Sequence, residues 1–357
     1  MVLPYLHKHF AFNGLSFSTV AQLRIFAEEL SHGTHEHNVP IGNFLTEWLS
    51  EHPTVSVKTS GATGTPKNIA LAKANMVNSA KATAAYFNLP EKTNALLCLP
   101  TAYIAGKMML VRAMVMGWEL QAVAPGKNVI AQNDKKYDFA AMVPYQVYHS
   151  MPGLDNIKKL IVGGGAIPYN LERQLQDKTT QAYATYGMTE TITHVAARPI
   201  NGAQKSKHYT ALPNVAFSKD PRGCLIVTAP HITPSAVTTN DSVALISPTA
   251  FTWSGRYDNV VNSGGVKLFP EKIEAKLAQK IKSNFIVTAE GDPALGKRLV
   301  LVVEEKQTTE KLDYSNAFKV LRPFEKPKKI YTLPKFPYTE TGKIKRAEIL
   351  KLLKLYR

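Results

Sequence analysis

The residues of this sequence best suited to chemistry lie in one run of hydroxyl, glycine and lysine residues. The run reads Thr59-Ser60-Gly61-Ala62-Thr63-Gly64-Thr65-Pro66-Lys67 and follows a short β-rich stretch at residues 55–57. The two glycines permit backbone conformations that other residues avoid, so consecutive N–H groups can converge on an anion. The Gly-Lys-Ser/Thr of a Walker loop is missing from the run. Taken alone, it predicts either a phosphate-binding loop or a hydrophilic turn.

Four further stretches combine glycine with ionisable or hydroxyl side chains. They read Gly163-Gly164-Gly165-Ala166-Ile167-Pro168, Tyr186-Gly187-Met188-Thr189-Glu190, Gly255-Arg256-Tyr257-Asp258 with Asn262-Ser263-Gly264-Gly265-Val266-Lys267, and Pro337-Tyr338-Thr339-Glu340-Thr341-Gly342-Lys343-Ile344-Lys345-Arg346. Alone, Glu190 would be a carboxylate at a helix start, where the helix dipole favours it. Asp241 alone would be a turn residue, and Lys343 alone a solvated lysine beside other cations.

The elements that must position these residues alternate between strand and helix from about residue 54. Strand patterns lie at residues 55–57, 95–99, 119–123, 139–143, 159–162 and 181–185, and helical patterns lie at 73–87, 106–116, 145–151 and 169–176. This alternation predicts a mainly parallel α/β sheet that binds ligands outside the carboxyl ends of its strands. Between residues 209 and 253 the helical period disappears and turn residues separate short β-rich runs, which predicts a small β subdomain.

Composition narrows the class of protein. With 45% hydrophobic and 20% charged residues, and with 21 glycines and 22 prolines, the chain is globular rather than disordered or collagen-like. The two cysteines, Cys98 and Cys224, are too few for a disulfide framework or a Cys/His zinc site. Residues 1–12 lack a signal-peptide core, and no apolar run reaches the length of a membrane span. We therefore expect a cytoplasmic protein without membrane insertion.

The net charge is the unusual quantity. It is +16 for the whole chain, and +10 of it falls in residues 259–357. A basic tail of this kind predicts an anionic partner such as nucleic acid, a nucleotide or coenzyme A. Because the sequence contains no basic-aromatic recognition module, we do not expect nucleic acid to be that partner.

Together, the five motifs resemble those of the adenylate-forming acyl-CoA synthetase superfamily, and they occur in the family's order from residue 59 to residue 346. The resemblance implies an α/β fold: a large adenylation domain, residues 1–257, with mainly parallel sheets and a small β subdomain, then a small, mobile α+β domain, residues 258–357. It also implies a two-step reaction. ATP and a carboxylic acid give an acyl-adenylate and pyrophosphate, and coenzyme A then displaces AMP to give a thioester.

The resemblance further implies which residues bind ATP and Mg²⁺. The matching positions for ATP and AMP are Thr59, Ser60, Gly61, Thr63, Gly64, Lys67, Gly164, Gly165, Ala166, Tyr186, Gly187 and Asp241. The first loop would cradle the β- and γ-phosphates, residues 164–166 would form a ledge for adenine beside Tyr186, and Asp241 would bind the ribose hydroxyls. Thr189 would contact the α-phosphate. Glu190 would hold Mg²⁺, a hard ion that prefers oxygen ligands.

By the same resemblance, Lys343 is the catalytic lysine that stabilises charge on the α-phosphate and carboxylate during adenylation, with Arg256 assisting at the ribose or phosphate. Asp258 corresponds to the hinge between the domains. The small domain would rotate after adenylation and offer Gly264 and Gly265 to the thiol-bearing arm of coenzyme A, with Lys267 nearby. The basic tail fits this polyanionic co-substrate.

Within the superfamily the chain is most similar to short o-succinylbenzoate–CoA ligases, which serve menaquinone (vitamin K2) biosynthesis. The similarity is carried by residues 103–109, Tyr-Ile-Ala-Gly-Lys-Met-Met, and by Tyr209 and Leu212-Pro213. Arg112 lies on a helical face with methionines, where burial is costly without an anion. It pairs either with an internal carboxylate or with a second carboxylate on the substrate. Gly106, Lys107 and Arg112 are the predicted contacts of the acid, whereas the methionines are expected to be core.

Other functions stay open. The chain could activate another aryl or fatty acid, or be a stand-alone adenylation domain that loads a carrier protein; a basic nucleic-acid-binding protein is the alternative from another class. Three departures from the family stand out: Ala62 replaces a threonine, Tyr103 stands where many relatives have histidine, and the region before residue 59 is short. The short N-terminal region leaves a supporting homodimer open.

Overall fold

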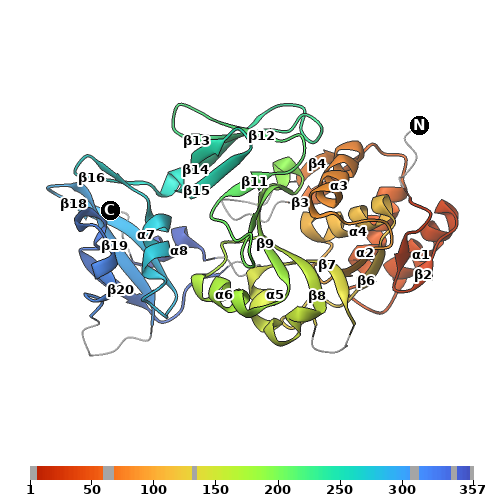
Figure 1. The fold of residues 1–357 in the computed structure, drawn as a ribbon, viewed down its shortest axis with the longest axis horizontal. Helices are drawn as coiled ribbons and strands as arrows, with labels where there is room; N and C mark the ends of the chain where they lie inside the picture. Colours follow the sequence, from red (N-terminus) through yellow and green to blue (C-terminus); the bar gives the residue numbers. More distant parts are fainter. Residues whose placement is uncertain (1–5, 59–67, 131–134, 306–312, 339–343, 354–357) are drawn as a thin grey trace.

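A computed structural model describes residues 6–58, 68–130, 135–305, 313–338 and 344–353 of the protein. The phosphate-loop residues 59–67 and the catalytic candidate Lys343 therefore lie outside the described residues. Figure 1 shows the N-terminal helices at one end of the molecule and the C-terminal strands at the other.

The main element is a thirteen-stranded sheet, with strand order β12-β13-β14-β15-β11-β10-β9-β8-β7-β5-β6-β1-β2. Its strands are β1 (Ala11–Phe12), β2 (Leu15–Ser16), β5 (Asn94–Leu97), β6 (Glu119–Ala122), β7 (Tyr137–Met142), β8 (Ile157–Val162), β9 (Gln181–Gly187), β10 (His194–Pro199), β11 (Tyr209–Ala211), β12 (Ala216–Lys219), β13 (Cys224–Thr228), β14 (Val237–Ser247) and β15 (Ala250–Arg256). Pairing is parallel from β1 through β6, β5, β7 and β8 to β9, and antiparallel elsewhere.

Helices bury both faces of the parallel part. The helices of the large unit are α1 (Val20–His32), α2 (Val39–Leu49), α3 (Lys73–Phe87), α4 (Ile104–Met116), α5 (Pro144–His149) and α6 (Tyr169–Gln174). Residues of α1 to α4 belong to one apolar cluster and residues of α5 and α6 to another, and alternate residues of β7 and β8 enter each cluster. Strands buried on both faces read as continuous apolar runs, which is why their sequences are rich in Ala, Ile, Leu and Val.

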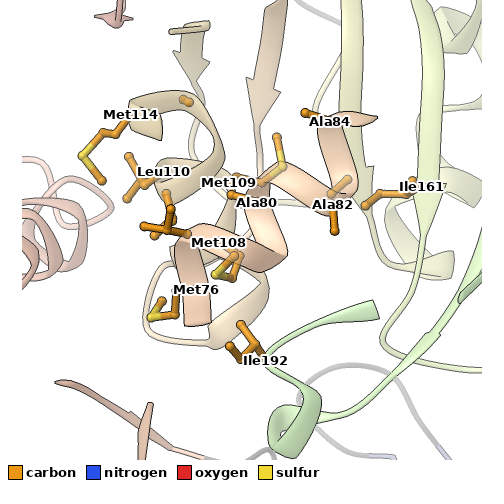
Figure 2. Packing of buried hydrophobic residues seen from close by; sticks show 14 of the residues in the cluster. Met76, Ala80, Ala82, Ala84, Met108, Met109, Leu110, Met114, Ile161 and Ile192 are labelled. Atoms are coloured by element: carbon orange, nitrogen blue, oxygen red, sulfur yellow. The ribbon is translucent and has the colours of Figure 1, made fainter. Parts of the chain in front are cut away.

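Helix α4 is apolar on nearly all sides because it lies inside the first cluster. Residues 106–114 are all buried, and Met108 and Met109 pack beside residues of α3 (Figure 2). The prediction that these methionines are core is confirmed. The same burial encloses two cations on this helix, Lys107 and Arg112.

The strands found where the sequence predicts a small β subdomain belong to the main sheet. Strands β12 to β15 continue the main sheet, because β15 pairs with β11, β11 with β10, and β10 with β9. The turn residues that separate the short β-rich runs include the hairpin connections β12–β13 and β14–β15 within this sheet. The sheet is consequently mixed rather than mainly parallel, and the α/β class holds in this coarser form.

The chain after residue 257 has apolar clusters of its own. Its elements are β16 (Val261–Ser263), β17 (Val266–Leu268), α7 (Pro270–Leu277), β18 (Phe285–Asp292), β19 (Gly296–Glu304), β20 (Lys329–Leu333) and α8 (Arg346–Leu352). Two clusters bury residues of this segment alone. A domain boundary near residue 257 would require separate cores of this kind on its two sides. The boundary itself stays a prediction. Among the helices of the described ranges, none is both long and apolar enough to cross a bilayer.

Candidate active site

The adjacent carboxyl ends of β8 and β9 bring two of the sequence motifs together. The two strands pair in parallel, so the turn at residues 163–166 and the segment that starts at Tyr186 leave the sheet at the same edge. Antiparallel strands β3 (Thr54–Lys58) and β4 (Asn68–Ala72) flank the 59–67 loop. Because ligands of α/β sheets bind outside the carboxyl ends of the strands, this edge is the candidate ligand site.

Asp241 is the centre of a polar cluster at this edge. Its Oδ2 accepts a hydrogen bond from the Tyr186 hydroxyl at 2.7 Å, and its Oδ1 accepts one from Trp253 Nε1 at 3.1 Å. The Arg256 guanidinium lies 3.6 Å from Oδ1 and 3.3 Å from an oxygen of Asp258. Three residues that the motifs predict at the nucleotide, Tyr186, Asp241 and Arg256, are thus brought into one cluster from three strands, together with the predicted hinge residue Asp258 in the following turn.

The charge state of this cluster follows from burial. Burial is the main cause that raises the pKa of the Tyr186 phenol, and the neighbouring Asp241 carboxylate raises it further. The hydroxyl therefore stays protonated and donates its hydrogen bond. Arg256 shares its guanidinium between two carboxylates. The cluster can consequently present a fixed carboxylate and a cation to a sugar and a phosphate.

Thr189 and Glu190 lie in a short 3-10 turn, η3 (Thr189–Thr191), which follows β9 directly. Glu190 is exposed, and it makes no hydrogen bond to any residue within the described ranges. Its carboxylate is available to an incoming ligand. The side chain thus has the exposure that the predicted metal role requires.

Arg112 is the most unusual group of the site. Its side chain is 2% exposed, and its partners are Thr193 Oγ1, at 3.1 Å from Nη2, and the sulfur of Met109, at 3.6 Å from Nη1. Its Nε is buried without a hydrogen-bond partner. The sequence leaves open whether Arg112 pairs with an internal carboxylate or with a carboxylate of the substrate. Among the described residues, no carboxylate is a partner of Arg112.

Neutral polar side chains lie next to Thr193, the hydroxyl partner of this arginine. Ser79 Oγ lies 3.2 Å from Thr193 Oγ1, and Thr83 Oγ1 lies 3.4 Å from His194 Nε2. Desolvation lowers the pKa of Arg112 to about 9, so it remains cationic at neutral pH. Desolvation and the nearby Arg112 charge lower the pKa of His194 well below its usual value. The result is a buried positive charge in a neutral polar shell.

Two other predicted acid contacts have structural partners. Lys107 Nζ lies 3.3 Å from Glu47 Oε2 and donates to the carbonyl of Ser56 at 3.0 Å. A Cβ on Gly106 would come within 2.4 Å of the Pro100 carbonyl oxygen, so glycine is needed for the approach of α4 to the preceding loop. The Lys107 ammonium is therefore already paired within the protein, and the roles of Gly106 and Lys107 as contacts of the acid stay predictions.

The coenzyme-site predictions fall on the C-terminal segment. Gly264 and Gly265 form the two-residue turn between β16 and β17, with φ of 55° and 82°; two positive φ values in a hairpin turn favour a Gly-Gly pair. Lys267 on β17 is exposed. Lys343 lies outside the described part of the chain, but the bridge between Tyr338 and Ile344 brackets its segment.

Sequence reasoning missed several residues of the site. Trp253 looks like a strand aromatic, and its role as a donor to Asp241 depends on the β14–β15 pairing. Ser79, Thr83, Thr193 and His194 come from α3 and from the segment after Glu190. The available signal was the sequence Thr191-Ile192-Thr193-His194, which directly follows a recognised motif.

Comparison with known proteins identifies the family of this chain. The family described as "AMP-binding enzyme" matches residues 26–217. The structure of an acyl-CoA synthetase (AMP-forming)/AMP-acid ligase II-like protein from Dyadobacter fermentans is 35% identical, with a TM-score of 0.62 over 92% of this chain and 98% of that chain. The 2-succinylbenzoate–CoA ligase of Lactococcus lactis is 24% identical over 85% of this chain and 72% of its own length.

The fold is also that of the o-succinylbenzoate coenzyme A synthetase of Bacillus subtilis, solved in complex with ATP and magnesium ion. That structure has a TM-score of 0.69 at 17% identity over 92% of this chain and 82% of that chain. The chain therefore belongs to the AMP-binding, adenylate-forming enzymes. Within them it is an AMP-forming acid–CoA ligase.

Proposed function

We propose that this enzyme is an o-succinylbenzoate–CoA ligase. In the first step the aliphatic carboxylate of o-succinylbenzoate attacks the α-phosphate of ATP, which gives the acyl-adenylate and releases pyrophosphate. In the second step the thiol of coenzyme A attacks the acyl carbon, which forms the thioester and releases AMP. The second, aromatic carboxylate takes no part in the bond changes and serves for recognition.

The observation that carries this substrate is Arg112. A buried guanidinium with no carboxylate partner in the described ranges is costly, because its desolvation is not offset by an opposite charge. An acid with a second carboxylate would supply that charge, and Thr193 and His194 could hydrogen-bond the remaining oxygens. A monocarboxylic aryl or fatty acid would leave the guanidinium uncompensated.

The names of relatives point to the same acid. Besides the Lactococcus lactis enzyme, the 2-succinylbenzoate–CoA ligase of Escherichia coli is 26% identical over 80% of this chain, and a probable one of Mycobacterium tuberculosis is 25% identical over 85%. Identity at this level supports the reaction class more strongly than the substrate. The buried arginine is therefore the stronger argument for the substrate.

We assign ATP to the strand-end cluster. Asp241 would bind the ribose hydroxyls, Tyr186 and residues 164–166 would hold adenine, and Arg256 would reach the ribose or the phosphates. Thr59, Ser60, Gly61, Thr63, Gly64 and Lys67 would bind the β- and γ-phosphates. In the second step, Gly264, Gly265 and Lys267 would face coenzyme A, with Asp258 at the hinge.

The residues present suit a Mg²⁺ ion that arrives with ATP. Within the described residues no group of three or more His, Cys, Asp or Glu could hold a metal, whereas Mg²⁺ usually takes one or two carboxylates together with substrate phosphates. The exposed Glu190 carboxylate, next to Thr189, is such a ligand. When bound, the ion supplies charge neutralisation at the phosphates. Thr189 and Lys343 would then stabilise the charge that develops at the α-phosphate.

Acid-dependent exchange of labelled pyrophosphate into ATP tests the proposal. Among o-succinylbenzoate, benzoate and a medium-chain fatty acid, we expect o-succinylbenzoate to support exchange with a kcat/KM at least about 10²-fold above the others, since an unpaired buried charge is expensive. Preference for benzoate or the fatty acid would contradict it. Exchange without transfer to free coenzyme A would instead indicate an adenylation domain that loads a carrier protein.

A further inference from the structure

One short segment connects the proposed metal ligand to the partner of Arg112. Residues 188–193 join β9 to β10 and turn back on themselves through three backbone hydrogen bonds. Thr191 N–H donates to the Met188 carbonyl at 3.1 Å, Ile192 N–H to the Thr189 carbonyl at 2.9 Å, and Thr193 N–H to the Thr191 carbonyl at 2.7 Å. The segment is therefore a compact unit that contains both Glu190 and Thr193.

The hydroxyl of Thr191 braces this unit from inside. Met188 N–H donates to Thr191 Oγ1 at 3.0 Å, and the same oxygen lies 3.0 Å from the Met188 carbonyl and 2.8 Å from the Thr193 carbonyl. The residue is fully buried. One hydroxyl thus joins the residue before Thr189 to the residue that meets Arg112.

The backbone at Ile192 shows that the turn is held under strain. Its φ of 65° and ψ of −64° are those of a rare, strained γ-turn, and a β-branched residue is poorly suited to them. The side chain is 1% exposed and packs in the apolar cluster that contains Met76 and Met108 (Figure 2). Apolar packing on one side and the Thr191 hydroxyl on the other keep the turn in this conformation.

We propose that Thr191 is a positioning residue that couples recognition of the acid's second carboxylate to the binding of Mg²⁺ and ATP. The proposal rests on the proposed function, in which Arg112 binds that carboxylate and Glu190 the metal. A carboxylate at Arg112 changes the bond between Nη2 and Thr193 Oγ1, now 3.1 Å long. Because Thr191 ties Thr193 to Met188, the change is transmitted to Thr189 and Glu190. Linkage requires the reverse effect as well: MgATP strengthens binding of the acid.

Calorimetric binding of o-succinylbenzoate, with and without saturating Mg²⁺ and α,β-methylene-ATP, measures this coupling. We expect the nucleotide analogue to tighten acid binding in the wild type by about tenfold, within the usual range of such couplings. Thr191→Ser keeps the hydroxyl and should keep the coupling. Thr191→Val keeps the shape without the hydroxyl and should reduce the coupling to about twofold or less, while acid affinity without nucleotide changes little.

A second variant covers the case in which Thr191→Val does not fold. Thr193→Val, at a half-buried position, removes the hydroxyl that accepts the hydrogen bond from Arg112. This variant should also lose the coupling. Coupling as large as in the wild type, in either valine variant, would overturn the role of Thr191 and leave the proposed function standing. Absence of o-succinylbenzoate binding to the wild-type enzyme would overturn the proposed function and, with it, this inference.

Discussion

Replacing Arg112 with methionine is expected to remove the preference for o-succinylbenzoate. Truncating one partner of a buried, hydrogen-bonded charge pair costs about 2–5 kcal/mol, so the kcat/KM for o-succinylbenzoate relative to benzoate should fall on the order of 10²- to 10³-fold. Pyrophosphate exchange with each acid gives this ratio. The physical reason is that the second carboxylate would be buried without a counter-charge.

The same substitution is expected to leave the fold as stable as the wild type or more stable. Apolar replacement of buried charges is often neutral or stabilising, and Arg112 has an unpaired Nε and no carboxylate partner among the described residues. Thermal unfolding without substrate checks this. A lower melting temperature together with an unchanged preference among acids would mean that Arg112 is structural.

Lys107 offers a matched comparison on the same helix. It is also a buried cation, but it is paired with Glu47. Lys107→Met leaves that carboxylate unpaired, so the melting temperature should fall while the ratio between the two acids stays within a few-fold. A large loss of preference for o-succinylbenzoate would instead support Lys107 as a contact of the acid.

Replacing Lys343 with alanine is expected to slow formation of the acyl-adenylate by about 10²- to 10³-fold. This is the usual effect of removing one preorganised group that stabilises developing charge. Single-turnover formation of the adenylate from ATP and o-succinylbenzoate measures the first step. The second step, started from synthetic acyl-adenylate and coenzyme A, should keep its rate within a few-fold, because the assigned role of the lysine ends with adenylation.

Lys345 is the control for this experiment. It is exposed and pairs with Glu348 at 2.9 Å, and surface pairs of this kind contribute little to stability. Lys345→Ala should therefore retain both steps. Equal losses in the two variants would show that general basicity of the tail matters rather than one lysine.

Local patterns in the sequence predict the elements that hold the site. The helix expected at residues 73–87 is α3, Lys73–Phe87, and the strand expected at 119–123 is β6, Glu119–Ala122. Long helices with clear periodicity and strands between turn residues carry their signal in neighbouring residues. The meeting of the 163–166 turn with Tyr186 also follows, because parallel strands end at one edge.

Contacts between distant residues could not be predicted in this way. The continuation of the sheet into β15 depends on its pairing with β11, in which Tyr209 lies opposite Phe251 and Thr210 opposite Ala250. These partners are far apart in the sequence, and three other strands lie between them along the chain. The surroundings of Arg112 depend on α3 and on the turn at Ile192, whose positive φ no local rule anticipates for a β-branched residue. The sequence could therefore indicate a buried arginine without showing that its neighbours are neutral.

The most direct measurement is mass spectrometry of the products formed by the purified protein with ATP, Mg²⁺, coenzyme A and o-succinylbenzoate. Parallel reactions contain benzoate or a medium-chain fatty acid. We expect AMP and the coenzyme A thioester of o-succinylbenzoate, with little thioester from the other acids. A thioester of benzoate or of the fatty acid, with none from o-succinylbenzoate, would contradict the account of substrate recognition by Arg112.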